Sequence, residues 1–222
     1  MLNEMNASNV WPMDGTTVVR DWFSYSMLKR ALDIVVSALV LIATLPLWVV
    51  IAIAIKLESR GPVFFCQERV GLNGRHFCCL KFRTMQVDAE ARLEEMRRRG
   101  EVEGMVFKIR HDPRVTRVGN VLRHTSLDEL PQLLNVFKGE MTLVGPRPLI
   151  PSQIERFAPA DLVRLRVKPG LTCLWVVRGR SDGTFETWMA ADREYVSRRS
   201  TLLDLVIIFQ TIFIVATGRG AY

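Results

Sequence analysis

The stretch IVVSALVLIATLPLWVVIAIAI, residues 34–55, is the strongest structural signal in the chain, because its 22 residues include no charged side chain. About 20 consecutive apolar residues are needed for a helix to cross the hydrocarbon core of a bilayer. The stretch is too long for the apolar part of a cleaved signal peptide, and no small-residue cleavage site follows it. It therefore predicts a membrane helix that the protein keeps.

Two features of this stretch favour a helix that enters the membrane and returns over one that crosses it. Pro46 lies in the middle, where a proline ring removes a backbone hydrogen bond and clashes with the preceding turn. Basic residues flank both ends, Lys29 and Arg30 before the stretch and Lys56 after it, whereas a spanning helix is expected to have one flank poorer in positive charge. We expect a re-entrant helix broken near Pro46, with a straight span as the alternative.

The rest of the chain predicts a mixed, mainly helical domain. Apolar runs at Phe64–Cys66 and Phe77–Leu80 enclose Gly71–Gly74, a pattern typical of a β-hairpin. The apolar run Leu205–Ala216 is too short to span a bilayer and fits an interfacial helix and a core helix equally well. The predicted fold is therefore a monotopic α+β membrane protein. Its parts are a flexible leader (1–28), the re-entrant helix (29–58) and a cytoplasmic domain (59–222).

Charge and cysteine content narrow the functional classes. A net charge of +7 predicts a surface that attracts nucleic acid, anionic lipid or phosphorylated substrates. Nucleic acid is the least favoured of these, since the sequence shows no recognised nucleic-acid motif and no aromatic stacking platform. The four cysteines have neither CxxC spacing nor histidine pairs placed for zinc. We expect reduced thiols in a cytosolic compartment.

The densest group of reactive side chains surrounds Asp128 and Glu129. Pro131 is tolerated only in the first turn of a helix, so a helix is expected to begin near Asp128, where its dipole and free amides stabilise negative charge. The apolar residues at helical spacing, expected to face the core, are Leu127, Leu130, Leu134 and Phe137. The alternative is a capping box, in which Ser126 and Glu129 only close the start of the helix.

Several basic side chains complement this acidic pair. Arg147 stands between two prolines, whose locked φ angles stiffen its backbone and allow its planar guanidinium to be aimed at phosphates. Lys81 follows the predicted hairpin, where alternating charge is equally typical of a solvated strand face. Arg180 lies in a glycine-containing basic turn, which is as common in inert loops as in anion-binding nests.

Four short strings occur in order behind the membrane stretch. They are KFRTM (81–85), SLDELPQL (126–133), LVGPRP (143–148) and KPGLT (168–172). Together they resemble the bacterial sugar transferase family, the monotopic phosphoglycosyl transferases, and the likeness runs from about Lys29 to Tyr222. Any one of these strings is weak evidence for the family. All four in this order, behind a membrane helix that contains proline, are specific to it.

The resemblance implies a magnesium-dependent, two-step transfer at the cytoplasmic face of the bacterial inner membrane. Asp128 matches a nucleophile that attacks the sugar-linked phosphorus of a UDP-sugar and releases UMP, after which polyprenyl phosphate, here expected to be undecaprenyl phosphate, takes up the phosphosugar. Glu129 matches its partner in organising magnesium. The further matches are Lys81, Arg123 and Arg147 near the phosphates, Arg180 near the nucleotide, and Asp204 as an acidic position of less defined role.

The sequence departs from the family at one string and leaves other questions open. Family members often read Gly-Leu-Trp-Gln-Val where this chain has Cys173-Leu174-Trp175-Val176-Val177, so the sugar or nucleotide preference is not fixed. The hexose, the glycan pathway and the formation of a homodimer are likewise undetermined. The alternative function is a non-enzymatic membrane scaffold of a polysaccharide assembly complex, in which Asp128 and Glu129 only cap a helix.

Overall fold

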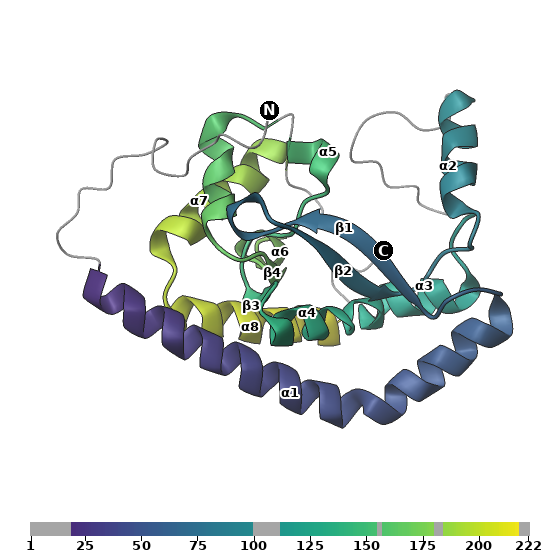
Figure 1. The fold of residues 1–222 in the computed structure, drawn as a ribbon, viewed down its shortest axis with the longest axis horizontal. Helices are drawn as coiled ribbons and strands as arrows, with labels where there is room; N and C mark the ends of the chain where they lie inside the picture. Colours follow the sequence, from purple (N-terminus) through teal and green to yellow (C-terminus); the bar gives the residue numbers. More distant parts are fainter. Residues whose placement is uncertain (1–18, 100–111, 155–156, 180–183, 218–222) are drawn as a thin grey trace.

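The computed structural model describes residues 19–99, 112–154, 157–179 and 184–217, which are mainly helical with two small sheets (Figure 1). The α-helices are α1 (Val19–Glu58), α2 (Ala89–Arg98), α3 (Arg117–His124), α4 (Gln132–Lys138), α5 (Pro151–Ile154), α6 (Leu174–Val177), α7 (Phe185–Arg198) and α8 (Thr201–Ala216). The 3-10 helices are η1 (Leu72–Gly74), η2 (Leu127–Glu129) and η3 (Pro159–Arg166). The strands are β1 (Phe64–Val70), β2 (His76–Phe82), β3 (Thr142–Val144) and β4 (Gly170–Thr172).

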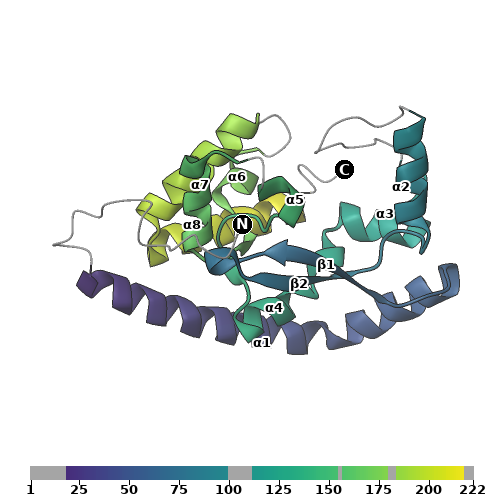
Figure 2. The same ribbon diagram turned by 45° about the horizontal axis from the view of Figure 1, so that its top comes forward.

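The long helix α1 curves along one side of the molecule, with α4 and α8 beside it (Figures 1 and 2). It is the one helix among the described residues that is long and apolar enough to cross a membrane. The helix runs through Pro46 without interruption, so the break expected near this proline is wrong. The Thr44 hydroxyl near this proline donates to the Val40 carbonyl (2.7 Å). It begins at Val19, so residues 19–28, which the sequence assigned to a flexible leader, are helical; the first 18 residues lie outside the described part.

Both ends of α1 are attached to the same body of the protein. Near the first end, the Lys29 ammonium donates to the carboxylate of Asp204 on α8 (2.7 Å). At the other end, the guanidinium of Arg83, directly after β2, donates to the backbone carbonyls of Ser59 and Arg60 (both 2.9 Å). The apolar stretch of α1 therefore runs along the folded domain and is attached to it near both ends.

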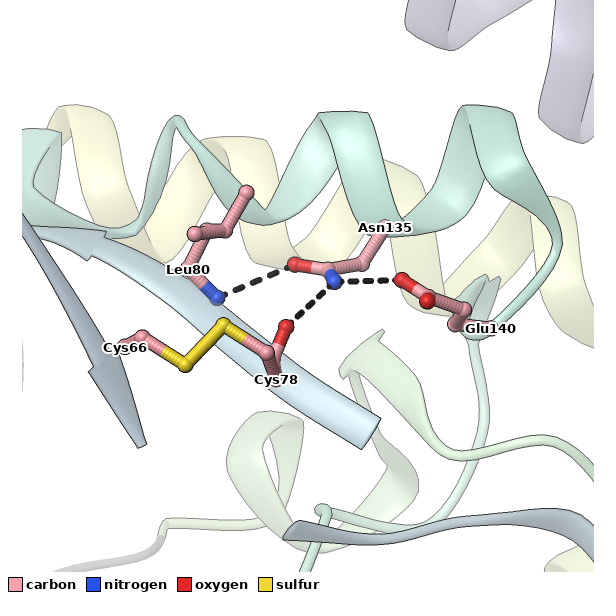
Figure 3. Close-up of a disulfide and its surroundings, with 5 residues drawn as sticks. All are labelled: Cys66, Cys78, Leu80, Asn135 and Glu140. Carbon is pink, nitrogen blue, oxygen red and sulfur yellow. Dashed lines mark hydrogen bonds between the residues drawn. A yellow bond between two sulfur atoms is a disulfide. The ribbon is translucent and has the colours of Figure 1, made fainter. Parts of the chain in front are cut away.

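The predicted hairpin is confirmed, because β1 and β2 pair antiparallel with Phe64 opposite Phe82. Cys66 and Cys78 are joined by a disulfide across the two strands (Figure 3). The expectation of four reduced thiols is therefore wrong for this pair, since their strands bring together two residues that the spacing did not connect. Cys79 and Cys173 are free and buried.

A single amide side chain fixes α4 against the edge of β2 (Figure 3). The Asn135 oxygen accepts a hydrogen bond from the Leu80 amide (3.1 Å), and its nitrogen donates to the Cys78 carbonyl (2.7 Å) and to Glu140 (2.7 Å). Because α4 follows directly after the acidic pair, this contact also sets Asp128 and Glu129 against the strand that carries Lys81.

The face predicted to be buried near the acidic pair is confirmed in part and is wrong at Phe137. Leu127 and Leu130 are half-buried and pack against the core, but Phe137 is 45% exposed. The buried apolar residues of α4 are Leu133 and Val136. The prediction assumed one continuous helix, whereas a separate 3-10 turn precedes α4, and such a turn advances the side chains at a different angle per residue.

Candidate active site

Asp128 and Glu129 lie in the short turn η2, between α3 and α4. The chain reverses at Ser126, whose positive φ of 57° is unusual for a residue with a side chain. The helix α4 begins at Gln132 with Pro131 at its N-cap, so the acidic pair precedes this helix instead of starting it. Ser126, which is among the described residues, makes no side-chain capping bond. The capping-box alternative is therefore wrong.

Lys81 provides the positive charge that faces this acidic pair. Its ammonium lies 2.8 Å from Glu129 Oε1 and 3.7 Å from Asp128 Oδ2. Its side chain is only 20% exposed, which contradicts the alternative of a solvated strand face. The lysine comes from β2 and the carboxylates from η2, so the hairpin and the turn together form the centre of the site.

The carboxylate of Asp128 is largely withdrawn from water, with its side chain 11% exposed. Burial raises the pKa of Asp128; Lys81 and Arg123 oppose this rise, and the charge of Glu129 adds to it. The sequence predicts a helix N-terminus that favours the ionised form of this group, but desolvation is the largest influence on its pKa. A poorly hydrated carboxylate held near two cations loses less solvation when it attacks an electrophile.

Arg123 reaches the site because α3 packs unusually close to the end of β2. A Cβ atom on Gly119 would lie 2.0 Å from the Thr84 carbonyl oxygen, so this approach requires glycine. The Arg123 Nε then donates to the Thr84 hydroxyl (2.9 Å). Burial lowers the pKa of Arg123, and the charges of Asp128 and Asp112 counteract this.

Arg147 lies on the loop after β3, which contacts the hairpin. Burial raises the pKa of the Cys79 thiol on β2, and the charges of Lys81, Arg69, Glu129 and Arg147 also act on that thiol. The loop after β3 holds Arg147 against the hairpin, because the Pro148 carbonyl accepts a hydrogen bond from Arg69 on β1 (2.9 Å). Within the described residues, the Arg147 guanidinium makes no hydrogen bond or ion pair, which leaves it available to a ligand.

Two predicted site residues remain. Arg180 falls outside the described residues. The Asp204 carboxylate is buried and accepts hydrogen bonds from Lys29 (2.7 Å) and from the hydroxyls of Tyr25 (3.0 Å) and Tyr195 (2.8 Å). These contacts join α1, α7 and α8, so in this structure Asp204 connects helices.

Comparison with known proteins confirms the resemblance seen in the four strings. A family model described as bacterial sugar transferase matches residues 24–218. The chain belongs to the bacterial sugar transferase family. A similar protein is the exopolysaccharide production protein ExoY of Sinorhizobium fredii, which is 44% identical over 198 residues that cover 87% of this chain and 88% of that protein.

Two further relatives of this sugar transferase have more specific names. The UDP-glucose:undecaprenyl-phosphate glucose-1-phosphate transferase of Caulobacter vibrioides is 41% identical, over 87% of this chain and 72% of that protein. The undecaprenyl-phosphate galactose phosphotransferase of Salmonella typhimurium is 39% identical, over 90% of this chain and 42% of that protein.

The acidic pair of this sugar transferase also has the donor chemistry that magnesium prefers. Among the described residues, no three histidine, cysteine or acidic side chains form a cluster that could hold a metal alone. Magnesium, however, is usually bound by one or two carboxylates together with substrate phosphates and water. The adjacent carboxylates of Asp128 and Glu129 fit this arrangement once a phosphorylated substrate supplies further oxygen atoms.

Sequence reasoning assigned no functional role to Arg69 and Arg164, although both contact the loop that carries Arg147. Arg69 donates to the Pro148 carbonyl, 79 positions away along the chain, and Arg164 donates to the carbonyl of Arg147 itself. A bond from an arginine to a backbone carbonyl leaves no motif, so no pattern in the sequence could reveal these contacts.

Proposed function

We propose that this sugar transferase transfers a hexose-1-phosphate from a UDP-hexose to undecaprenyl phosphate, as the first membrane step of exopolysaccharide, O-antigen or related glycan synthesis. The observation that carries the proposal is the buried Asp128 carboxylate beside Glu129, Lys81 and Arg123. The names of the relatives support a UDP-sugar donor and an undecaprenyl phosphate acceptor, with glucose and galactose as the candidate hexoses.

In the first step of the proposed reaction, an oxygen of Asp128 attacks the phosphorus that carries the sugar. The bond from that phosphorus to the bridging oxygen of the pyrophosphate breaks, and UMP leaves with the electron pair. The phosphosugar stays on the carboxylate as an acyl phosphate. A carboxylate attacks an anionic phosphorus only when the charge around that phosphorus is offset, and Lys81, Arg123 and Arg147 supply positive charge for this purpose.

In the second step, a phosphate oxygen of the polyprenyl phosphate attacks the same phosphorus and frees Asp128. Dividing the transfer in this way lets a water-soluble donor and a membrane-bound acceptor use one site in turn. Magnesium, held by Asp128 and Glu129 together with the donor phosphates, would supply additional neutralisation of the pyrophosphate charge. Glu129 also holds the ammonium of Lys81 beside the nucleophile (2.8 Å).

The attachment of α1 supports a re-entrant placement in the cytoplasmic face of the inner membrane. A helix that crossed the bilayer would put its two ends on opposite sides, yet both ends of the apolar stretch bind the one folded domain. The exposed apolar side chains include Leu39, Ile42, Leu45, Val49, Val50 and Ile53 of α1 and Leu205, Phe209, Ile212 and Phe213 of α8. The middle of α1 would then enter the lipid, and α8 would lie at the interface with the buried Ile207 facing the protein.

The function is tested by measuring UMP release from UDP-glucose and UDP-galactose with purified full-length protein, undecaprenyl phosphate and magnesium. Asp128→Asn is expected to reduce the rate on the order of 10³-fold or more, because it removes the nucleophile. Asp88→Asn is the matched control, since Asp88 lies on the surface and pairs with Arg92 (2.7 Å). Wild-type activity in the Asp128→Asn variant would refute Asp128 as the nucleophile, whereas a wild-type protein that releases no UMP would favour a non-enzymatic scaffold.

A further inference from the structure

The loop that carries Arg147 is held by an unusual set of hydrogen bonds. Pro146 and Pro148 have no backbone N–H, so the loop can donate few bonds of its own. Its four successive carbonyls nevertheless all accept one, and each donor comes from another part of the chain. Pro146 O accepts from Gly170 N (2.9 Å), Arg147 O from Arg164 Nη2 (2.6 Å), Pro148 O from Arg69 Nη1 (2.9 Å) and Leu149 O from Val70 N (2.8 Å).

Two of these donors are guanidinium groups from different elements. Arg69 lies near the end of β1 and Arg164 lies in η3, and they bind the carbonyls of Arg147 and of the next residue. Arg164 is itself fixed, because it is 3% exposed, lies 3.1 Å from the carboxylate of Asp192 and packs 5.0 Å from the ring centre of Trp188. Hydrogen bonds from charged donors are roughly twice as strong as neutral ones.

Close packing removes the remaining freedom of this loop. A Cβ atom on Gly170 would lie 2.0 Å from the Gly145 amide nitrogen, so the two backbones are in direct contact. The cavity between the hairpin, the loop and η3 has a volume of only about 10 Å³, which is about the space of a single water molecule. Close packing therefore holds the backbone of Arg147 in addition to the hydrogen bonds.

The charges show why this anchoring matters. Arg69 and Arg164 bind adjacent carbonyls of the segment that carries Arg147, and the positive charge of Arg147 contributes to lowering the pKa of both. An anion bound to the Arg147 guanidinium would relieve that repulsion. We propose that Arg69 and Arg164 are positioning residues, which hold the backbone of Arg147 so that its guanidinium binds the pyrophosphate of the UDP-sugar. This inference rests on the proposed function.

A double-mutant cycle tests whether Arg69 acts through Arg147. Arg147→Ala is expected to lower kcat/KM for the UDP-sugar and the affinity for UDP, each by about 10- to 100-fold, the effect of losing a charged hydrogen bond. Arg69→Met should lower both kcat/KM and UDP affinity by about tenfold in the wild-type background. In the Arg147→Ala background, the same substitution should lower them by less than about twofold. Arg69→Lys keeps a positively charged donor group and should recover part of the loss. Arg164→Lys should show the same dependence on Arg147.

Arg83→Met is the matched control, because Arg83 also donates to two backbone carbonyls but does so at the end of α1. In the Arg83→Met/Arg147→Ala double variant, the fold loss of UDP affinity should equal the product of the two single losses to within about twofold. Independent, multiplying effects of Arg69→Met and Arg147→Ala would overturn the inference, as would an Arg147→Ala variant with unchanged UDP affinity. If Arg69→Met fails to fold, the same cycle is measured with Arg69→Lys, and multiplying effects there would overturn the inference equally.

Binding of UDP, measured by calorimetry, separates this inference from the proposed function. A wild-type protein that releases no UMP from either UDP-sugar would refute the proposed reaction. The cycle in UDP affinity would still show whether Arg69 acts through Arg147.

Discussion

Replacing Lys81 with methionine should move the acid side of the pH–activity profile to higher pH. Burial already raises the pKa of Asp128, and Lys81 is the strongest influence that lowers it. Without the ammonium, the pKa of Asp128 rises further, so the carboxylate is protonated at a higher pH. Because only the ionised form can attack phosphorus, activity falls as the pH drops through this higher value.

The separation of the two groups sets the size of the effect. With 3.7 Å between Lys81 Nζ and Asp128 Oδ2 and an effective dielectric constant of about 20, Coulomb's law gives about 4.5 kcal/mol. This corresponds to an upper limit of about 3 pH units. Lys81 is partly exposed and shares its charge with the closer Glu129, so we expect a shift of about 1 to 2 pH units.

The assay is kcat/KM for UMP release between about pH 5 and pH 9, which reports the pKa values of the free enzyme. Lys81→Arg is the control and should keep the acid limb near its wild-type position. An acid limb that stays in place in an active Lys81→Met variant would refute the assignment of Asp128 as the ionised nucleophile beside Lys81.

The packing of the site and the membrane face lead to four more predictions. Asp128→Asn should raise Tm at neutral pH by a few degrees, which corresponds to about 1 kcal/mol of stability. The reason is that a carboxylate whose pKa is raised by folding destabilises the folded state above that pKa. The gain in Tm should therefore vanish in thermal melts at low pH. Lys29→Met should cost about 3 kcal/mol or more in denaturant unfolding, because it leaves the buried Asp204 without its cation (2.7 Å). Gly119→Ala should cost about 1–3 kcal/mol, since its Cβ would lie 2.0 Å from the Thr84 carbonyl, and a wild-type Tm would contradict the close approach. Phe209→Asp, at a side chain 75% exposed, should weaken retention of α8 on vesicles in a flotation assay without lowering Tm.

Local patterns predicted the parts of the fold that depend on neighbouring residues. The Gly71–Gly74 turn between two apolar runs correctly predicted the hairpin, and the uncharged stretch correctly predicted a long apolar helix. The burial of Phe137 was mispredicted because a 3-10 turn precedes Pro131 and α4, which changes the phase of the side chains. Periodicity alone does not reveal such a change.

Contacts between residues far apart in the chain could not be predicted from local sequence patterns. The partner of Asp204 is Lys29, 175 positions away, so its role in joining helices could not be read from the sequence around it. The arginines that hold the Arg147 loop bind backbone carbonyls, which every residue has. For the acidic pair, the sequence predicted the residues but not the direction of the pKa shift, because burial depends on how α3, β2 and η2 pack.

The most direct test of the central claim is an intact-mass measurement on the purified protein incubated with UDP-glucose or UDP-galactose and magnesium, without undecaprenyl phosphate. The account predicts release of about one equivalent of UMP and a mass increase of one hexose phosphate, which peptide mapping places on Asp128 and undecaprenyl phosphate then removes. An unmodified protein that nevertheless turns over when the acceptor is added, or a label on another residue, would contradict it.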